Sequence, residues 1–225
     1  MIDYTITRSR RKTIAIYITK DAAVEVRAPL GIRKDEIHCF LMSKQEWIKK
    51  HLHSRRESLK NKSDFSLSYG DIVCMQGAEY PINPSSGNSI GFDGKCFYLP
   101  PGLPSEEIRR GVIEIYIEAA KKVLTHKTVK YSKIMSVTPR AIKVNGAKTR
   151  WGSCSGKDSI NFSWRLIMAD DGVIDYVVVH ELAHIIEHNH SPRFWAVVTS
   201  ILPDYKIRQK RLKELQQRLS AEDWD

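Results

Sequence analysis

The sequence predicts an α+β fold, in which a β-rich N-terminal part with one long helix precedes a mainly helical part. Three observations predict this order. Residues 2–29 alternate in polarity with the period of a strand, residues 32–60 repeat apolar positions with the period of a helix, and residues 172–188 form a strongly apolar helical segment. With 225 residues, the chain is long enough for one large domain or two small ones.

The N-terminal part begins with a predicted hairpin. Residues 13–19 alternate between aliphatic and more polar side chains, and a turn at Lys20-Asp21 leads into a second such run at 24–27. The helix over 32–60 follows, because its apolar residues recur at spacings of three, four and seven. Four further strands are then predicted, over 71–75, 79–82, 89–92 and 96–99.

A break rich in proline and glycine at 100–102 is the predicted boundary between two domains, residues 1–102 and 103–225. After this break, residues 137–169 are again typical of strands, with a hairpin turn at 156–159. The remaining segments predict helices over about 105–131, 172–188, from Ser191-Pro192 onward, and 204–219.

The formal net charge is +10, and much of it lies early in the chain. Residues 1–62 hold 15 Lys and Arg against 7 Asp and Glu, a net of +8. Such a surplus favours weak association with an anionic partner such as a nucleic acid or a nucleotide, although a solvated basic surface explains it more simply. The best candidate for a contact surface is the helix over 32–60, with Lys49, Lys50, Arg55 and Arg56.

Several features of the composition indicate a cytoplasmic protein without a membrane anchor. No apolar run reaches the roughly 18 to 20 residues of a membrane span. The first residues lack the basic and apolar regions of a signal peptide. The four cysteines are far apart and form no CxxC pair, so reduced thiols are expected.

The segment His180-Glu181-Leu182-Ala183-His184 is an HExxH motif. Residues four apart lie on one face of a helix, so His180 and His184 can bind one tetrahedral ion, with Glu181 beside them as a proton acceptor. The surrounding helix is apolar nearly all round and should be buried, where imidazoles and a carboxylate are costly unless paired or ligated. The sequence therefore predicts a zinc site, with Glu181 as the general base.

A third ligand has several candidates. His188 lies on the same stripe, but about 12 Å of helix rise separates it from His180. If Asn189 takes a left-handed conformation at the helix end and Ser191 begins the next helix, His190 can turn back toward the ion. We favour His190 for this reason. The carboxylate alternatives are Glu187, Asp204 and Glu214.

Three protein ligands leave one tetrahedral position open for water, which is typical of a catalytic zinc site. Zinc lowers the pKa of such a water toward 7, so that Glu181 can take its proton and the hydroxide can attack a carbonyl or phosphoryl centre. Imidazole ligands favour Zn²⁺, although manganese, nickel or cobalt could substitute.

The sequence resembles the YgjP-like metal-dependent hydrolases, which are relatives of the SprT-like metallopeptidases among the zincins. The resemblance covers nearly the whole chain. Its most specific motifs are 149–155, 160–162, the HExxH motif at 180–184, and 190–195. It implies a zincin-like metallopeptidase domain with a β-hairpin before the HExxH helix. It also implies zinc ligands His180, His184 and His190, with Glu181 catalytic.

The segment around Trp151 precedes the HExxH helix and predicts the start of that hairpin. An extended substrate can pair with the edge of such a strand. Structural packing is one explanation of these residues, and contact with the substrate or the transition state is the other. The candidates for such contacts are Arg150, Trp151, Ser153 and Tyr176.

Three functions follow as hypotheses. A zinc-dependent metallopeptidase acting on a peptide or protein is favoured by the HExxH site. The resemblance also admits a metal-dependent UTP pyrophosphatase acting on a nucleotide, although the sequence has no phosphate-binding glycine loop. The third is a DNA-associated, SprT-like protein, which the basic charge would permit.

Overall fold

The computed structural model describes residues 3–224 and has the predicted α+β class. It divides into two compact units. Unit 1 contains residues 3–65 and 219–223, and unit 2 contains residues 66–218 and Trp224. Residues 1, 2 and 225 lie outside the description, and with them the first residue of the predicted strand region 2–29.

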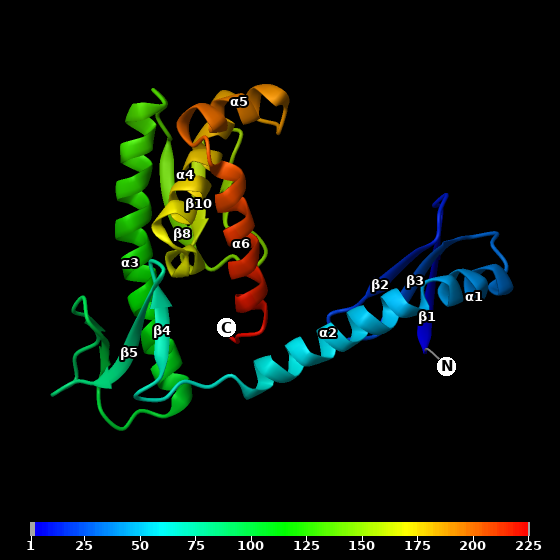
Figure 1. Ribbon diagram of the computed structural model, residues 1–225, viewed down its shortest axis with the longest axis horizontal. Coiled ribbons are helices and arrows are strands. Elements are labelled where there is room, and N and C mark those ends of the chain that lie inside the picture. The colour runs from blue at the N-terminus through cyan, green and yellow to red at the C-terminus, as the bar shows by residue number, and fades with distance from the viewer. Residues whose placement is uncertain (1–2, 225) are drawn as a thin grey trace. The chain divides into compact units, whose positions relative to one another are not determined.

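Unit 1 is a three-stranded sheet covered by two helices. Strands β1 (Tyr4–Ser9), β3 (Val24–Pro29) and β2 (Ala15–Ile18) lie in that order (Figure 1). The antiparallel pair β2–β3 confirms the predicted hairpin, and β1 adds to β3 in parallel. The core combines apolar residues of β3 and of both helices, namely Val24, Val26, Ala28, Ile37, Leu41 and Ile48.

The single helix predicted over 32–60 is two helices, α1 (Lys34–Ser43) and α2 (Gln45–Asp64). The chain leaves the helical conformation at Lys44, where φ is −111° and ψ is 12°. The break allows Leu41 of α1 and Ile48 of α2 to enter the same core. A regular apolar spacing continues across such a break, which explains why the spacing did not reveal it.

Unit 2 begins with a second sheet, which packs against the longest helix. Its order is β4 (Ile72–Met75), β5 (Ala78–Pro84), β7 (Phe97–Leu99) and β6 (Gly91–Phe92). Tyr116 of α3 (Ser105–Ile134) donates a hydrogen bond to the Cys74 carbonyl at 2.8 Å, and its ring packs against Phe97. The boundary between the two compact units lies between residues 65 and 66. The predicted boundary at 100–102 is a turn inside unit 2, between β7 and α3.

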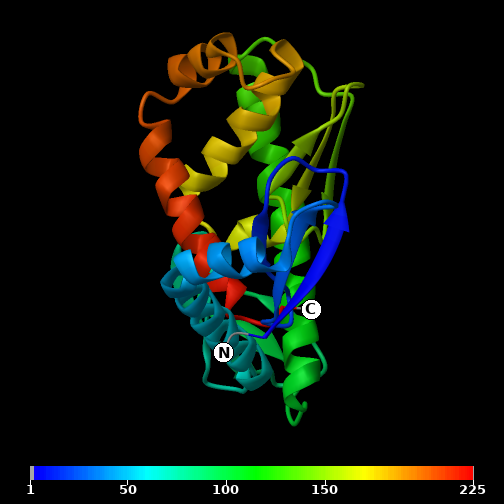
Figure 2. The ribbon, with the colours of Figure 1, turned by 90° about the vertical axis from the view of Figure 1, so that its right-hand side faces the viewer.

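The third sheet has the order β8 (Ala141–Asn145), β10 (Ser159–Ser163), β9 (Gly152–Cys154). Strands β9 and β10 are antiparallel, as the predicted hairpin requires. The short helix η1 (Trp164–Met168) then leads to α4 (Asp171–Ile186), α5 (Pro192–Ile201) and α6 (Tyr205–Ser220). Figures 1 and 2 show that α4 lies between α3 and α6.

Local signals explain where α4 begins and ends. The Asp170 carboxylate accepts a hydrogen bond from the Val173 N–H at 3.0 Å and caps the first turn. The helix ends at Ile186 because Glu187 is extended. Asn189 has no positive φ, so the predicted left-handed cap is wrong. Ser191 caps α5 as predicted, with Pro192 at its first position.

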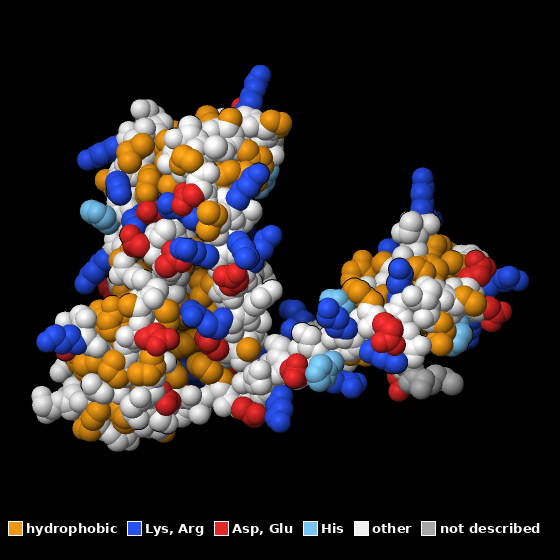
Figure 3. All heavy atoms as spheres, viewed as in Figure 1, with side chains coloured by type: hydrophobic (Ala, Val, Ile, Leu, Met, Phe, Trp, Pro, Cys, Tyr) orange, Lys and Arg blue, Asp and Glu red, His pale blue; other side chains and the backbone are white. Residues whose placement is uncertain are grey.

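The surface of the described chain carries mixed charges. In the view of Figure 3, Lys and Arg side chains lie over both units with acidic side chains among them. Within residues 3–224, none of the helices combines the length and the apolar character that a membrane crossing needs.

Candidate metal centre

Three histidines converge at the C-terminal half of α4. His180 and His184 lie one turn apart on that helix, and His190 lies in the segment that leads to α5. One ring nitrogen from each lies within 4.8 Å of the other two. The Nε2 atoms of His180 and His190 are 3.1 Å apart. The three side chains can therefore present nitrogen ligands to one ion.

A backbone contact fixes the tautomer of His184. Its Nδ1 lies 3.2 Å from the Glu187 carbonyl oxygen, which can only accept a hydrogen bond. The Nδ1–H therefore donates, and Nε2 keeps the lone pair that a metal ligand requires. The extended conformation of Glu187 thus serves the site, because it turns this carbonyl toward the ring.

Burial keeps His180 neutral. Burial, followed by the nearby rings of His184 and His190, lowers its pKa to about 3. Its Nδ1 is buried and has no hydrogen-bond partner among the described residues. Three close imidazoles that cannot all hold protons suit a divalent cation of the borderline type, such as zinc. The residues present therefore fit the metal that the motif implies.

Glu181 lies on the side of α4 that faces β9 and is only 6% exposed. Burial raises the pKa of its carboxyl to about 7, although a hydrogen bond from the backbone of Cys154 opposes the rise. A carboxylate with a pKa near neutrality can both take and return a proton at physiological pH. This is the chemistry that the sequence predicts for Glu181.

Gly152 on β9 makes room for the Glu181 side chain. A Cβ at this position would lie 2.6 Å from both Cγ and Oε1 of Glu181. Every larger residue would therefore push the carboxylate away or shift the strand. This role cannot be seen in the motif at 149–155 alone, because only the fold brings β9 against α4.

Aromatic side chains of α5 lie against the histidines, and sequence reasoning assigned no role to them. The buried ring of Phe194 lies 5.0 Å from His180, 4.5 Å from His184 and 4.8 Å from His190, measured between ring centroids. Trp195 is half-buried and lies 5.7 Å from His190. The only signal in the sequence was the position of both residues soon after His190.

The other candidate ligands are not part of this group among the described residues. His188 is exposed, and the Asp204 carboxylate accepts hydrogen bonds from Arg208 at 2.9 and 3.0 Å. Glu214 lines a separate cavity of about 440 Å³ next to the start of α4. Glu187 contributes its carbonyl oxygen to His184.

The predicted substrate contacts lie in different surroundings. Arg150 and Ser153 line a small cavity of about 10 Å³ between the strands, and Arg150 is exposed. Trp151 is half-buried, and its carbonyl accepts a hydrogen bond from the Ser163 N–H at 2.8 Å. Tyr176 is buried, and burial raises the pKa of its hydroxyl to about 12. The ring of Tyr176 lies 5.8 Å from that of His180.

Similar sequences and structures are found among known proteins. The family model described as "YgjP-like, metallopeptidase domain" matches residues 12–215. A crystal structure of the metallopeptidase zymogen of Pyrococcus abyssi abylysin is similar at 22% sequence identity and a TM-score of 0.33. The similarity covers 44% of this chain and 90% of that one. No curated protein matches the chain.

Proposed function

Since this chain belongs to the family of YgjP-like metallopeptidase domains, we propose that it is a zinc-dependent peptidase whose active site lies at the C-terminal half of α4. His180, His184 and His190 would hold the ion, and Glu181 would be the general base. The observation that carries the proposal is the convergence of three ring nitrogens within 4.8 Å of one another, beside a buried carboxyl of raised pKa.

The tautomers of the imidazoles support this assignment. His184 donates through Nδ1 to a backbone carbonyl, which orients its ring and leaves Nε2 free. When bound, zinc supplies a Lewis acid that polarises a carbonyl group and acidifies water.

Glu181 supplies the proton transfer. Its carboxylate accepts a proton from the attacking water and returns it to the nitrogen of the leaving amine. The hydrogen bond from the Cys154 backbone and the space over Gly152 hold the carboxylate in one place. A fixed acceptor saves the cost of ordering that group during the reaction.

Strand β9 provides a place for an extended peptide. It is the last strand in the order β8-β10-β9, and its Gly152 touches Glu181. An extended substrate can add to the edge of a sheet through main-chain hydrogen bonds, which bind the backbone with little regard to side chains. A peptide on this edge would pass next to the general base.

The test is cleavage of a peptide library by the zinc-loaded protein. We expect cleavage that is lost in Glu181→Gln and in His180→Ala, with bound zinc retained in the first variant and reduced in the second. His188→Ala is the matched control, because this exposed histidine lies near the site but outside the group. It should retain both zinc and activity.

A parallel assay covers the nucleotide hypothesis. The same proteins are incubated with nucleoside triphosphates, and the release of pyrophosphate and phosphate is measured. Release that depends on Glu181, without any peptide cleavage, would overturn the peptidase assignment. Peptide cleavage that survives in Glu181→Gln would show that this carboxylate is not the base.

A further inference from the structure

Four rings form a column that ends at His190. Tyr176 lies against Tyr205 with ring centroids 6.5 Å apart and an interplanar angle of 21°. Tyr205 stacks on Trp195 at 5.2 Å and 21°, and Trp195 lies 5.7 Å from His190 at 30°. The rings come from α4, α6, α5 and the segment between α4 and α5. The first two ring pairs are stacked, and the ring of Trp195 is tilted by 30° to that of His190.

His190 differs from the other two histidines in how it is held. His180 and His184 lie on a buried helix, and the His184 ring also contacts the Glu187 carbonyl. His190 is exposed and lies outside any helix, four residues beyond the end of α4. Its ring contacts are with the two other histidines, Phe194 and Trp195. Ring packing therefore has to fix an orientation that secondary structure does not.

Trp195 is suited to this task because of its neighbours on both sides. Within the column, His190 lies on one side of the Trp195 indole and Tyr205 lies on the other. Stacking on Tyr205 restricts the orientation of the indole ring. Tyr205 in turn lies against Tyr176, which is buried on α4 one turn before His180. The column therefore links the segment of His190, through α5 and α6, back to the helix that carries the first two histidines.

We propose that Trp195, supported by Tyr205 and Tyr176, is a positioning residue that orients the His190 imidazole for zinc. The inference rests on the proposed role of His190 as the third ligand. Residues that orient metal ligands typically contribute about 10- to 100-fold in metal affinity. Trp195 makes a ring contact rather than a hydrogen bond, so we expect the lower end, about 10-fold.

The chemistry of Tyr176 changes with this assignment. Tyr176 is one of the residues for which the sequence predicts a contact with the substrate or the transition state. Its ring is instead the buried end of the column, and its hydroxyl keeps its proton because burial raises the pKa to about 12. Tyr176 therefore acts here through its aromatic face.

The experiment is a double-mutant cycle on zinc affinity, measured by competition with a chromophoric chelator. It compares the wild type, Trp195→Leu, His190→Ala and the double variant. We expect Trp195→Leu to weaken binding about 10-fold in the wild type and to have no further effect once His190 is absent. Trp195→Phe keeps a ring next to His190 and should restore most of the affinity.

Two further variants make the result specific. Trp47→Leu is the matched control, because it makes the same exchange at a half-exposed tryptophan of unit 1. It should bind zinc like the wild type. If circular dichroism shows that Trp195→Leu does not fold, the pair Tyr205→Leu and Tyr205→Phe replaces it in the cycle, with the same expected contrast.

The outcomes separate this inference from the proposed function. Wild-type protein that binds no zinc would overturn both. Zinc binding that needs His190 but is unchanged in Trp195→Leu would overturn the positioning role alone. The same holds if Trp195→Leu weakens binding equally with and without His190, because the effect would then not act through His190, whether it came from general packing or from the Trp195 contact with His180 at 5.9 Å.

Discussion

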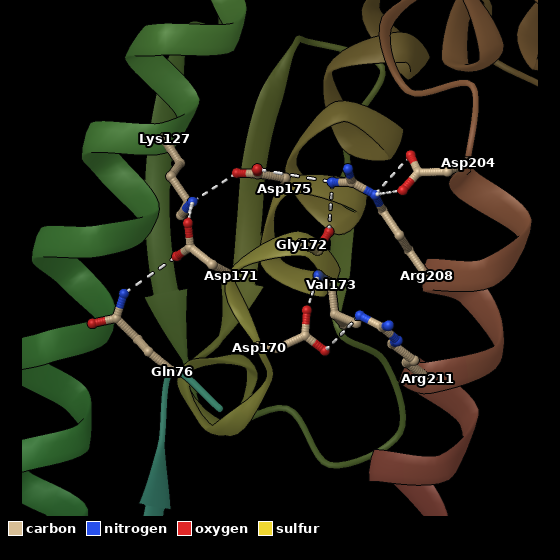
Figure 4. Close-up of polar contacts among 10 residues, drawn as sticks. All are labelled: Gln76, Lys127, Asp170, Asp171, Gly172, Val173, Asp175, Asp204, Arg208 and Arg211. Atoms are coloured by element: carbon tan, nitrogen blue, oxygen red, sulfur yellow. Dashed lines mark hydrogen bonds and ion pairs between the residues drawn. The ribbon is translucent and has the colours of Figure 1, made fainter. Parts of the chain in front are cut away.

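The two halves of α4 both place polar side chains against neighbouring parts of unit 2, but among the described residues only those of the N-terminal half have partners of opposite charge. At the N-terminal half, Asp171 and Asp175 accept hydrogen bonds from the Lys127 ammonium at 2.8 and 2.7 Å (Figure 4). Arg208 of α6 lies 3.8 Å from Asp175 and donates to the Gly172 carbonyl at 3.0 Å. Each charge therefore has an opposite charge from a neighbouring helix.

At the C-terminal half, three imidazoles face one another and no ion pair compensates them in the described chain. The Nδ1 of His180 is buried without a partner, and Glu181 is a buried carboxyl whose pKa is raised to about 7. Such groups cost stability in the free protein. Binding of a ligand such as a metal ion can offset that destabilisation. The charged groups of the N-terminal half need no such ligand, because they pair with one another.

The comparison separates the part of one helix that holds the fold from the part that would carry the proposed chemistry. Groups that the chain satisfies by itself fix α4 between α3 and α6. Groups that it leaves unsatisfied are the ones that a metal ion and a substrate would use. Substitutions in the N-terminal half should therefore lower stability more than activity, and those in the C-terminal half should lower activity more than stability.

The largest effect is expected for Glu181→Gln. Without the proton acceptor, peptide cleavage should fall about 10³-fold, while zinc binding persists. The metal-free variant should also unfold at a higher temperature than the wild type at pH 8, because the amide removes a carboxylate that is costly to bury. Steady-state kinetics and thermal unfolding by circular dichroism measure both changes. A variant that is both inactive and less stable would contradict the comparison.

A large loss of stability is expected for Lys127→Met. The Lys127 side chain is 10% exposed, and its removal leaves two carboxylates without their common partner. Of the two pairs, the one with Asp175 is buried, with side chains 10% and 15% exposed, and breaking it should cost about 3 kcal/mol of unfolding free energy, measured by urea denaturation. Zinc affinity should change little, because the network lies at the other end of α4.

Lys121→Met is the matched control for that substitution. Lys121 lies on the same helix α3, is 55% exposed and pairs with Glu118. Exposed pairs contribute less than about 1 kcal/mol. Equal losses in the two variants would mean that the Lys127 network contributes no more than a surface pair.

The sequence predicted the parts of this arrangement that follow from periodicity and capping. The HExxH spacing places His180 and His184 on one face of any helix, and Ser191-Pro192 marks the start of the next one. The same reasoning brought His190 close to the other two, although the expected left-handed Asn189 is replaced by an extended Glu187. The observed turn differs from the expected one but still places His190 beside the other two histidines, because α5 begins only two residues later.

Contacts between segments far apart in the sequence could not be predicted in this way. Lys127 and Asp175 are separated by 48 residues, and neither lies in a recognisable motif. The position of the turn at 100–102 inside unit 2 has a related explanation. Proline and glycine mark a turn, but the packing of Tyr116 against Phe97 decides that both sides of the turn belong to one unit.

The contact between Gly152 and Glu181 is of the same kind, and it gives the next prediction. In Gly152→Ala the added Cβ would lie 2.6 Å from Glu181 Oε1, so either the carboxylate or the strand must move, and we expect the carboxylate to do so. A displacement of about 1 Å can reduce kcat up to about 100-fold. Zinc affinity should be unchanged, since the three histidines do not touch this position.

Gly156→Ala is the control for that variant, because nothing lies within 4 Å of a Cβ built in this hairpin turn. Its kcat should equal that of the wild type. A Gly152→Ala variant with normal kcat would show that β9 can move away from α4 without cost. The contact with β9 would then not fix the position of the Glu181 carboxylate.

The smallest effect concerns the pH dependence of stability at the N-terminal half. The hydrogen bond from Lys127 lowers the pKa of Asp171 below its ordinary value of 3.8, so its ionised form stabilises the fold above that pH. This contribution is lost as the pH falls through the lowered pKa. Asp171→Asn should therefore be less stable than the wild type at neutral pH, by less than about 1 kcal/mol because Asp171 is 63% exposed. The difference should shrink toward acid pH, as the Asp171 carboxylate takes up its proton. A difference that grows below pH 4 would mean that the carboxylate of Asp171 destabilises the fold, and that Lys127 is held by Asp175 alone.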